Sequence, residues 1–168
     1  MPLKCIFALH LSNCRMEREA RYKELLTELD ALMDKEAGEV ANLANAAAIL
    51  HAAFDFHWTG FYLVRNGLLC LGPFQGPVAC TRIEKGRGVC GTAWENAAPI
   101  NVPDVNAFPG HIACSPLSRS ELVLPLFRSS GDVYAVLDID NSLPDYFSET
   151  DMTYLEEFNR ILSTGLGI

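Results

Sequence analysis

The sequence lacks an excess of positive charge and any long apolar run. Its 168 residues carry 13 Lys and Arg against 21 Asp and Glu, for a net charge of −8. Phosphate backbones and anionic membranes favour basic surfaces, so neither a nucleic acid nor a membrane is an expected partner. No apolar run approaches the about 20 residues of a membrane-spanning helix, and no small-residue cleavage pattern follows the short apolar start. We therefore expect a cytoplasmic protein.

The sequence also lacks repeats, low-complexity tracts and closely spaced cysteine pairs. Nine residues separate Cys80 from Cys90, and His111-x-x-Cys114 is the nearest approach to a ligand motif. Zinc sites usually present paired ligands at short spacing, so we expect no bound metal. A chain of this length in a reducing compartment also needs no structural disulfide. Reactive thiols are the remaining interpretation.

The position of each cysteine separates the structural candidates from the reactive ones. Cys70 lies in an alternating apolar run and is expected to be a small buried residue, while nothing indicates a role for Cys5 or Cys14. Cys90 begins a predicted helix after two basic residues, and Cys114 lies between His111 and Arg119. Helix N-termini and cationic neighbours lower thiol pKa values. Either cysteine is a candidate nucleophile on these grounds, and a second thiol nearby can resolve a sulfenic acid as a disulfide.

Apolar periodicity predicts helices near both ends of the chain. Leucines at helical spacing indicate a first helix ending near Gly38, and a second is expected to bury one face from Val40 to Phe54. A glycine-rich loop leads to a short helix over residues 89–96. Ser148 and Asp151 have the spacing of a capping box, which predicts a last helix.

Strands are expected between these helices. Two aromatic and β-branched runs flank Asn66-Gly67, which predicts a hairpin. Further strands are expected at 100–102 and on both sides of the Ser-Ser-Gly-Asp turn at 129–132. The whole pattern indicates one α+β domain over residues 1–168, with 1–15 as an N-terminal extension. The irregular segment from Pro103 to Ser120 is long enough to suggest a functional lid.

Three acidic residues interrupt the apolar strands near the end of the chain. Asp138 and Asp140 are two apart on one strand and so share a face, and Glu121 starts the neighbouring strand. Acids seldom point inward unless they are paired or functional. A buried carboxylic acid can donate a proton, and a carboxylate pair can bind an ammonium group. The alternative is a solvated acidic face.

Aromatic residues on an earlier strand provide an apolar wall. Trp58 and Tyr62 are four apart, with Gly60 between them, so both are expected on one face of the sheet. An aromatic wall suits a sulfur-containing ligand, because sulfur–aromatic contacts contribute about 0.3–1.5 kcal/mol. The alternative is that both rings are ordinary core residues.

Six segments, in order, resemble the free methionine-(R)-sulfoxide reductases, which are built on a GAF domain. They are WTGFYL, LGPFQGPVACTRI, GRGVCGTAW, VPDVNAFPGHIACS, SELVLPL and VLDIDN. The resemblance implies a GAF-like α+β domain with a central antiparallel sheet of about six strands flanked by helices, often in a homodimer. It also implies reduction of the R epimer of free methionine sulfoxide and recycling by a thioredoxin-type dithiol, without a bound cofactor.

The resemblance also assigns roles to individual residues. Cys114 corresponds to the catalytic nucleophile, and one of Cys80 and Cys90 to the resolving cysteine. The aromatic wall and the acidic cluster become the substrate pocket, with Glu121, Asp138 and Asp140 as candidate proton donors. Two other functions remain possible from the sequence: a GAF module that senses a small ligand without chemistry, and a protein whose cysteines respond to peroxide.

Overall fold

A six-stranded antiparallel sheet forms the centre of the computed structural model, which describes the backbone of residues 3–168 and the side chains of residues 16–168. The strands are β1 (Trp58–Arg65), β2 (Leu68–Gln75), β3 (Arg82–Ile83), β4 (Ile100–Val102), β5 (Ser120–Phe127) and β6 (Val133–Asn141). Their spatial order is β3-β2-β1-β6-β5-β4. The predicted α+β architecture is confirmed. The two-residue strand β3 has no counterpart among the strands that the residue pattern predicts.

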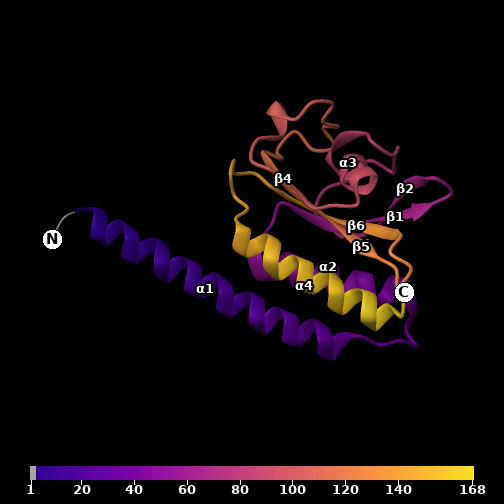
Figure 1. Ribbon diagram of the computed structural model, residues 1–168, viewed down its shortest axis with the longest axis horizontal. Coiled ribbons are helices and arrows are strands. Elements are labelled where there is room, and N and C mark those ends of the chain that lie inside the picture. The colour runs from indigo at the N-terminus through magenta and orange to yellow at the C-terminus, as the bar shows by residue number, and fades with distance from the viewer. Residues whose placement is uncertain (1–2) are drawn as a thin grey trace.

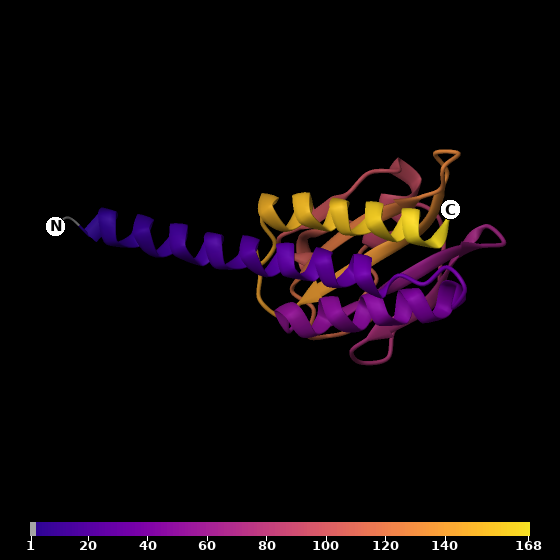
Figure 2. The ribbon, with the colours of Figure 1, turned by 90° about the horizontal axis from the view of Figure 1, so that it is seen from below.

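Helices cover both faces of the sheet, but unequally. The helices α1 (Leu3–Leu32), α2 (Gly38–Phe54) and α4 (Glu149–Leu166) lie on one face, and α3 (Gly88–Asn96) lies on the other (Figure 1). From below, α1 runs between α2 and α4 (Figure 2). A short 3-10 helix, Val105–Ala107, follows β4. The side chains of the N-terminal extension, Cys5 and Cys14 included, lie outside the described residues.

Strand alternation divides the apolar side chains into two cores. Phe61 on β1, Leu122 on β5 and Leu137 on β6 face the three-helix layer and are fully buried. The intervening residues of the same strands, such as Tyr62 and Val123, face α3. Successive side chains on a strand point to opposite faces. The sheet therefore separates a large helical core from a smaller core on the α3 side.

A buried carboxylate ties α1 to α4. Asp151 is fully buried and accepts hydrogen bonds from Arg18 Nε and Tyr22 Oη, both at 2.6 Å. It also accepts from the backbone N–H of Ser148 at 2.8 Å, within the predicted capping box. Because hydrogen bonds to charged groups contribute about 1.5–3 kcal/mol each, this cluster fixes α1 against the C-terminal helix.

The predicted boundaries near the first two helices are partly wrong. The first helix ends at Leu32 rather than near Gly38, and the side chain of Asn42 bonds both the N–H and the carbonyl of Asp34 in the turn that follows. Val40 was expected on the buried face of α2, but it is 68% exposed. A tertiary contact from α2, which helical spacing does not reveal, thus holds the turn after α1.

The hairpin predicted at Asn66-Gly67 is confirmed, and it joins β1 to β2. Asn66 and Gly67 both have positive φ, at 51° and 77°, as a tight hairpin turn of this kind requires.

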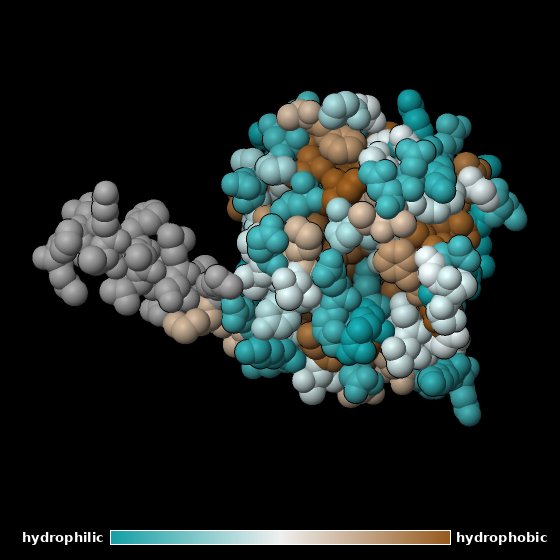
Figure 3. All heavy atoms as spheres, in the orientation of Figure 1, coloured by the Kyte–Doolittle hydropathy of each residue, from teal (hydrophilic) through white to brown (hydrophobic). Residues whose placement is uncertain are grey.

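Hydrophilic side chains cover much of the visible surface, with smaller hydrophobic areas between them (Figure 3). Within the described part of the chain, no helix combines the length and apolar character needed to cross a membrane.

Candidate active site

A cavity on the α3 side of the sheet is lined by most of the residues that the sequence singles out. They are Trp58, Tyr62, Cys90, Cys114, Glu121, Asp138 and Asp140. Cys80 does not line the cavity, but it is bonded to Cys114, which does. The structure therefore brings together residues from β1, α3, β5, β6 and the loops before β3 and β5.

The strand register explains how the three acids meet. Asp140 on β6 lies opposite Glu121 on β5 and, on its other side, opposite Trp58 on β1. Opposed residues have Cβ atoms about 4.5–5.5 Å apart. Asp138 is two residues from Asp140 and so points to the same face. The sequence-based expectation of one acidic cluster on adjacent strands is confirmed.

Burial changes the protonation of these acids. Burial raises the pKa of Glu121 and of Asp138 well above the usual range, and repulsion from neighbouring carboxylates raises both further. Burial also raises the pKa of Asp140, to about 6. Burial and mutual repulsion therefore favour the protonated forms of Glu121 and Asp138, while Asp140 is mostly ionised at neutral pH. The site contains both proton donors and a negative charge.

One oxygen of this cluster has no partner. Asp138 is 6% exposed, and its Oδ1 atom forms no hydrogen bond to any described residue. Most buried acceptors in native proteins are satisfied, so an orphaned one needs an explanation. A ligand with N–H donors or positive charge that enters the cavity would satisfy this oxygen.

The aromatic wall forms as the spacing predicts. Trp58 and Tyr62 stack with ring centroids 5.9 Å apart, and Phe74 from β2 stacks on Trp58 at 5.3 Å. Trp58 also donates through Nε1 to the carbonyl of Pro77 at 3.1 Å. Gly60 is required between the two β1 rings, because a Cβ there would collide with Phe74 and Trp58. The wall is thus both core and cavity lining.

Two of the loop cysteines form a disulfide. Cys80, after β2, is bonded to Cys114, before β5, with Cα atoms 5.6 Å apart. Cys70 and Cys90 are free. The sequence left open whether Cys80 or Cys90 partners Cys114, and the structure pairs Cys80 with it. Cys70 is only half-buried, rather than the fully buried residue that its strand pattern suggests.

Cys90 occupies a different environment from the one its sequence neighbours indicate. It is 4% exposed, and its Sγ donates to Glu121 Oε1 at 3.9 Å. Burial raises its pKa well above the ordinary value, and the adjacent acids Asp138 and Glu121 raise it further. The expectation that a helix N-terminus and preceding basic residues activate Cys90 is wrong, because burial beside acids outweighs both.

His111 lines the cavity, and His57 contacts the lining residue Ser115. From the sequence, His111 was considered only as a neighbour of Cys114, and His57 was given no role. His111 Nε2 lies 3.7 Å from Glu121 Oε2, and burial lowers the pKa of this histidine. His57 Nε2 lies 2.9 Å from the hydroxyl of Ser115, the residue after Cys114. His57 directly precedes β1, and neither contact has a local sequence signature. The only sequence signal for the position of His111 was its closeness to Cys114 along the chain.

Comparisons with known proteins agree with this geometry. The GAF domain family profile matches residues 35–166. A protein of Escherichia coli named free methionine-R-sulfoxide reductase is 44% identical over 137 residues, covering 81% of this chain and 82% of that protein. A Saccharomyces cerevisiae protein of the same name is 38% identical and covers 90% and 88%.

A solved structure adds a likeness in three dimensions. The X-ray structure of free methionine-R-sulfoxide reductase from Neisseria meningitidis in complex with its substrate has a TM-score of 0.86 at 50% identity, covering 89% of this chain and 90% of that one. The fold and the family profile therefore define a GAF domain protein. Within that class, the chain belongs to the free methionine-R-sulfoxide reductase family.

Proposed function

We propose that the protein reduces free methionine (R)-sulfoxide to methionine with its own cysteines. The disulfide between Cys80 and Cys114 carries this proposal, because Cys114 lines a cavity that is also lined by three buried carboxyl groups with raised pKa values. A redox-active pair next to proton donors suits the reduction of an oxidised sulfur atom. The names of the E. coli and N. meningitidis relatives support the choice of substrate and of epimer.

The reaction begins with the reduced pair. The Cys114 thiolate attacks the sulfoxide sulfur, and protons delivered to the sulfoxide oxygen allow the sulfur–oxygen bond to break. Glu121 and Asp138 can supply a proton, because burial raises the pKa of both and so favours their protonated forms. The protonated oxygen transfers to the Cys114 sulfur as the sulfur–sulfur bond made by the attack breaks, so methionine leaves and Cys114 carries a sulfenic acid.

The second half of the cycle restores the thiols. The Cys80 thiol condenses with the Cys114 sulfenic acid, which forms the disulfide and releases water. An external dithiol of the thioredoxin type then reduces the disulfide by thiol–disulfide exchange. Cys90 is an unsuitable resolving thiol, since burial among acids raises its pKa and keeps it protonated.

The pocket chemistry also accounts for a preference for the free amino acid. The ammonium group of a free amino acid can pair with Asp140, which is mostly ionised at neutral pH, and with the orphaned Oδ1 of Asp138. A methionine sulfoxide within a peptide offers an amide instead of that charge. The stacked rings of Trp58 and Tyr62 are placed to contact the methylthio end.

A coupled assay tests the cycle. NADPH oxidation with thioredoxin, thioredoxin reductase and free methionine (R)-sulfoxide should be abolished by Cys114→Ser. Cys80→Ser should yield one methionine per enzyme and then stop, whereas Cys90→Ser should continue through many turnovers. Cys70→Ser, on β2 outside the cavity, is the matched control and should behave as wild type.

Two results contradict the proposal, and a third would change one of its assignments. Full activity of Cys114→Ser would show that the nucleophile is wrongly assigned. Binding of the sulfoxide without consumption, under conditions in which the thiols are reduced, would identify a ligand sensor instead. Loss of recycling in Cys90→Ser with full recycling in Cys80→Ser would reverse the assignment of the resolving cysteine.

A further inference from the structure

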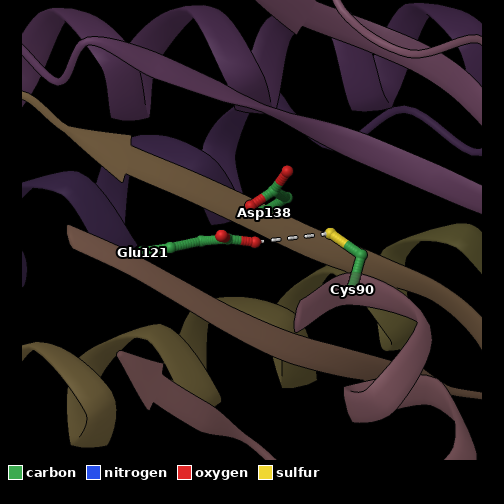
Figure 4. A group of neighbouring side chains, drawn as sticks. All are labelled: Cys90, Glu121 and Asp138. Atoms are coloured by element: carbon green, nitrogen blue, oxygen red, sulfur yellow. Dashed lines mark hydrogen bonds between the residues drawn. The ribbon is translucent and has the colours of Figure 1, made fainter. Parts of the chain in front are cut away.

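Three buried groups that can bind metals converge in the cavity. Cys90 comes from α3, Glu121 from β5 and Asp138 from β6, and their side chains point toward one another (Figure 4). One ligand atom from each lies within 4.8 Å of the other two, and the exposed fractions are 4%, 6% and 6%. The sulfur is not part of the proposed Cys80–Cys114 cycle.

The donor types in this group suit one class of cation. Thiolate sulfur and carboxylate oxygen are both common ligands of Zn²⁺, which is usually four-coordinate. His111 Nε2 lies 3.7 Å from the Glu121 carboxylate but outside this group of three ligands. Magnesium and calcium prefer six or more oxygen ligands, so the sulfur ligand disfavours them.

The orphaned oxygen of Asp138 described above also supports a cation at this cluster. The buried Oδ1 of Asp138 has no hydrogen-bond partner among the described residues. No Lys or Arg forms an ion pair with Asp138 or Glu121, and the only ion-pair contact of either carboxyl within that part of the chain is with His111. A bound divalent cation would satisfy the orphaned oxygen and screen the repulsion between the acids.

We propose that Cys90, Glu121 and Asp138 form a binding site for a divalent transition-metal ion of the Zn²⁺ class. Binding releases the thiol proton and the protons held by the acids, and no group is oxidised or reduced. The ion would occupy the Asp138 carboxyl, which is one of the two to which the proposed function assigns the substrate ammonium. A second part of the proposal, which rests on that function, is that the metal and the free amino acid compete.

Spacing rules cannot find such a site. The three ligands are separated by 31 and 17 positions along the chain, and each comes from a different element. They meet only because α3 packs over β5 and β6 in the folded protein. Motif searches detect pairs of ligands within one turn or loop.

Cobalt provides a spectroscopic test, because Co²⁺ commonly replaces Zn²⁺ and a thiolate ligand gives it a near-ultraviolet charge-transfer band. The protein is stripped with EDTA and kept in its disulfide form, so that neither Cys80 nor Cys114 is a free thiol. Titration with Co²⁺ should develop the band at one ion per chain. Cys90→Ala should abolish the band, and Asp138→Asn should raise the Kd at least about tenfold. Cys70→Ser, the control for an unrelated thiol, should titrate as wild type.

The outcomes separate the two parts of the proposal. Absence of the band in wild type, or its persistence in a folded Cys90→Ala protein, overturns the site. If Cys90→Ala melts well below wild type, Glu121→Gln replaces it as the ligand variant, and an unchanged Kd in that protein overturns the site. Free methionine should weaken Co²⁺ binding, and no effect overturns the competition. Turnover of the EDTA-treated protein in the coupled assay tests the proposed function independently.

Discussion

Replacing Asp140 with asparagine should remove a pH-dependent loss of folding stability. Burial raises the pKa of Asp140 to about 6, from 3.8 for a free aspartate. Between those two pH values the folded protein binds more protons at this position than the unfolded chain does, so stability falls as the pH rises through that window. A full shift of this size corresponds to about 3 kcal/mol, and Asp140 retains some solvent contact, so we expect a loss of about 2–3 kcal/mol.

Denaturant unfolding measures this effect directly. The free energies of unfolding of wild type and Asp140→Asn are compared at about pH 4 and about pH 8, with the disulfide intact. Asparagine cannot ionise, so the difference between variant and wild type should shift in favour of the variant by about 2–3 kcal/mol across that range. Effects of the substitution that do not depend on pH cancel in this comparison.

A second substitution serves as the control. Asp145 lies on an exposed turn, and Asp145→Asn removes the same charge without changing the cavity. Its difference from wild type should stay within about 0.5 kcal/mol at both pH values. If Asp140→Asn gains no stability relative to wild type at the higher pH, the cluster does not hold this carboxyl in a perturbed state, and the electrostatic description of the site fails.

Three further substitutions test other contacts. Gly60→Ala should raise the KM for the sulfoxide several-fold and lower stability by about 1–3 kcal/mol, because a Cβ there would collide with Phe74; wild-type values of both would contradict the packing of the wall. Tyr22→Phe should lower the free energy of unfolding in urea by about 1–3 kcal/mol, since it removes a donor at 2.6 Å from the buried Asp151, and a change below about 0.5 kcal/mol speaks against that role. His57→Ala should lower kcat/KM about tenfold at an unchanged melting temperature, because the ring anchors the loop of the proposed nucleophile, and unaltered kinetics would remove that assignment.

The fold was predictable where the determining chemistry is local. Positive φ at Asn66 and Gly67 follows from residue type, and the capping box at Ser148 needs only a spacing of three residues. The end of α1 was not predictable, because Asn42 from the next helix bonds the turn that follows α1. Strand β3 is two residues long and therefore carries no periodicity to detect.

The site was predictable where strand alternation sets the positions of side chains. Asp138 and Asp140 must share a face, and that face is the one that Trp58 occupies across the ladder. The residue pattern could not select the disulfide partner of Cys114, because distances between loops depend on tertiary packing. For the same reason the sequence misjudged Cys90, whose thiol environment is set by acids from two other strands.

The sheet separates the helical core from the residues of the candidate active site. On one side, three helices and the apolar strand faces form the larger core, closed by the Asp151 cluster. On the other side lie buried acids and thiols. Burying polar groups costs folding free energy, which the apolar core on the opposite face offsets. Because strand alternation keeps the two sets of side chains apart, substitutions on the reactive side can diversify without dismantling the scaffold. A family built this way can acquire new ligands or chemistry while its folding unit stays the same.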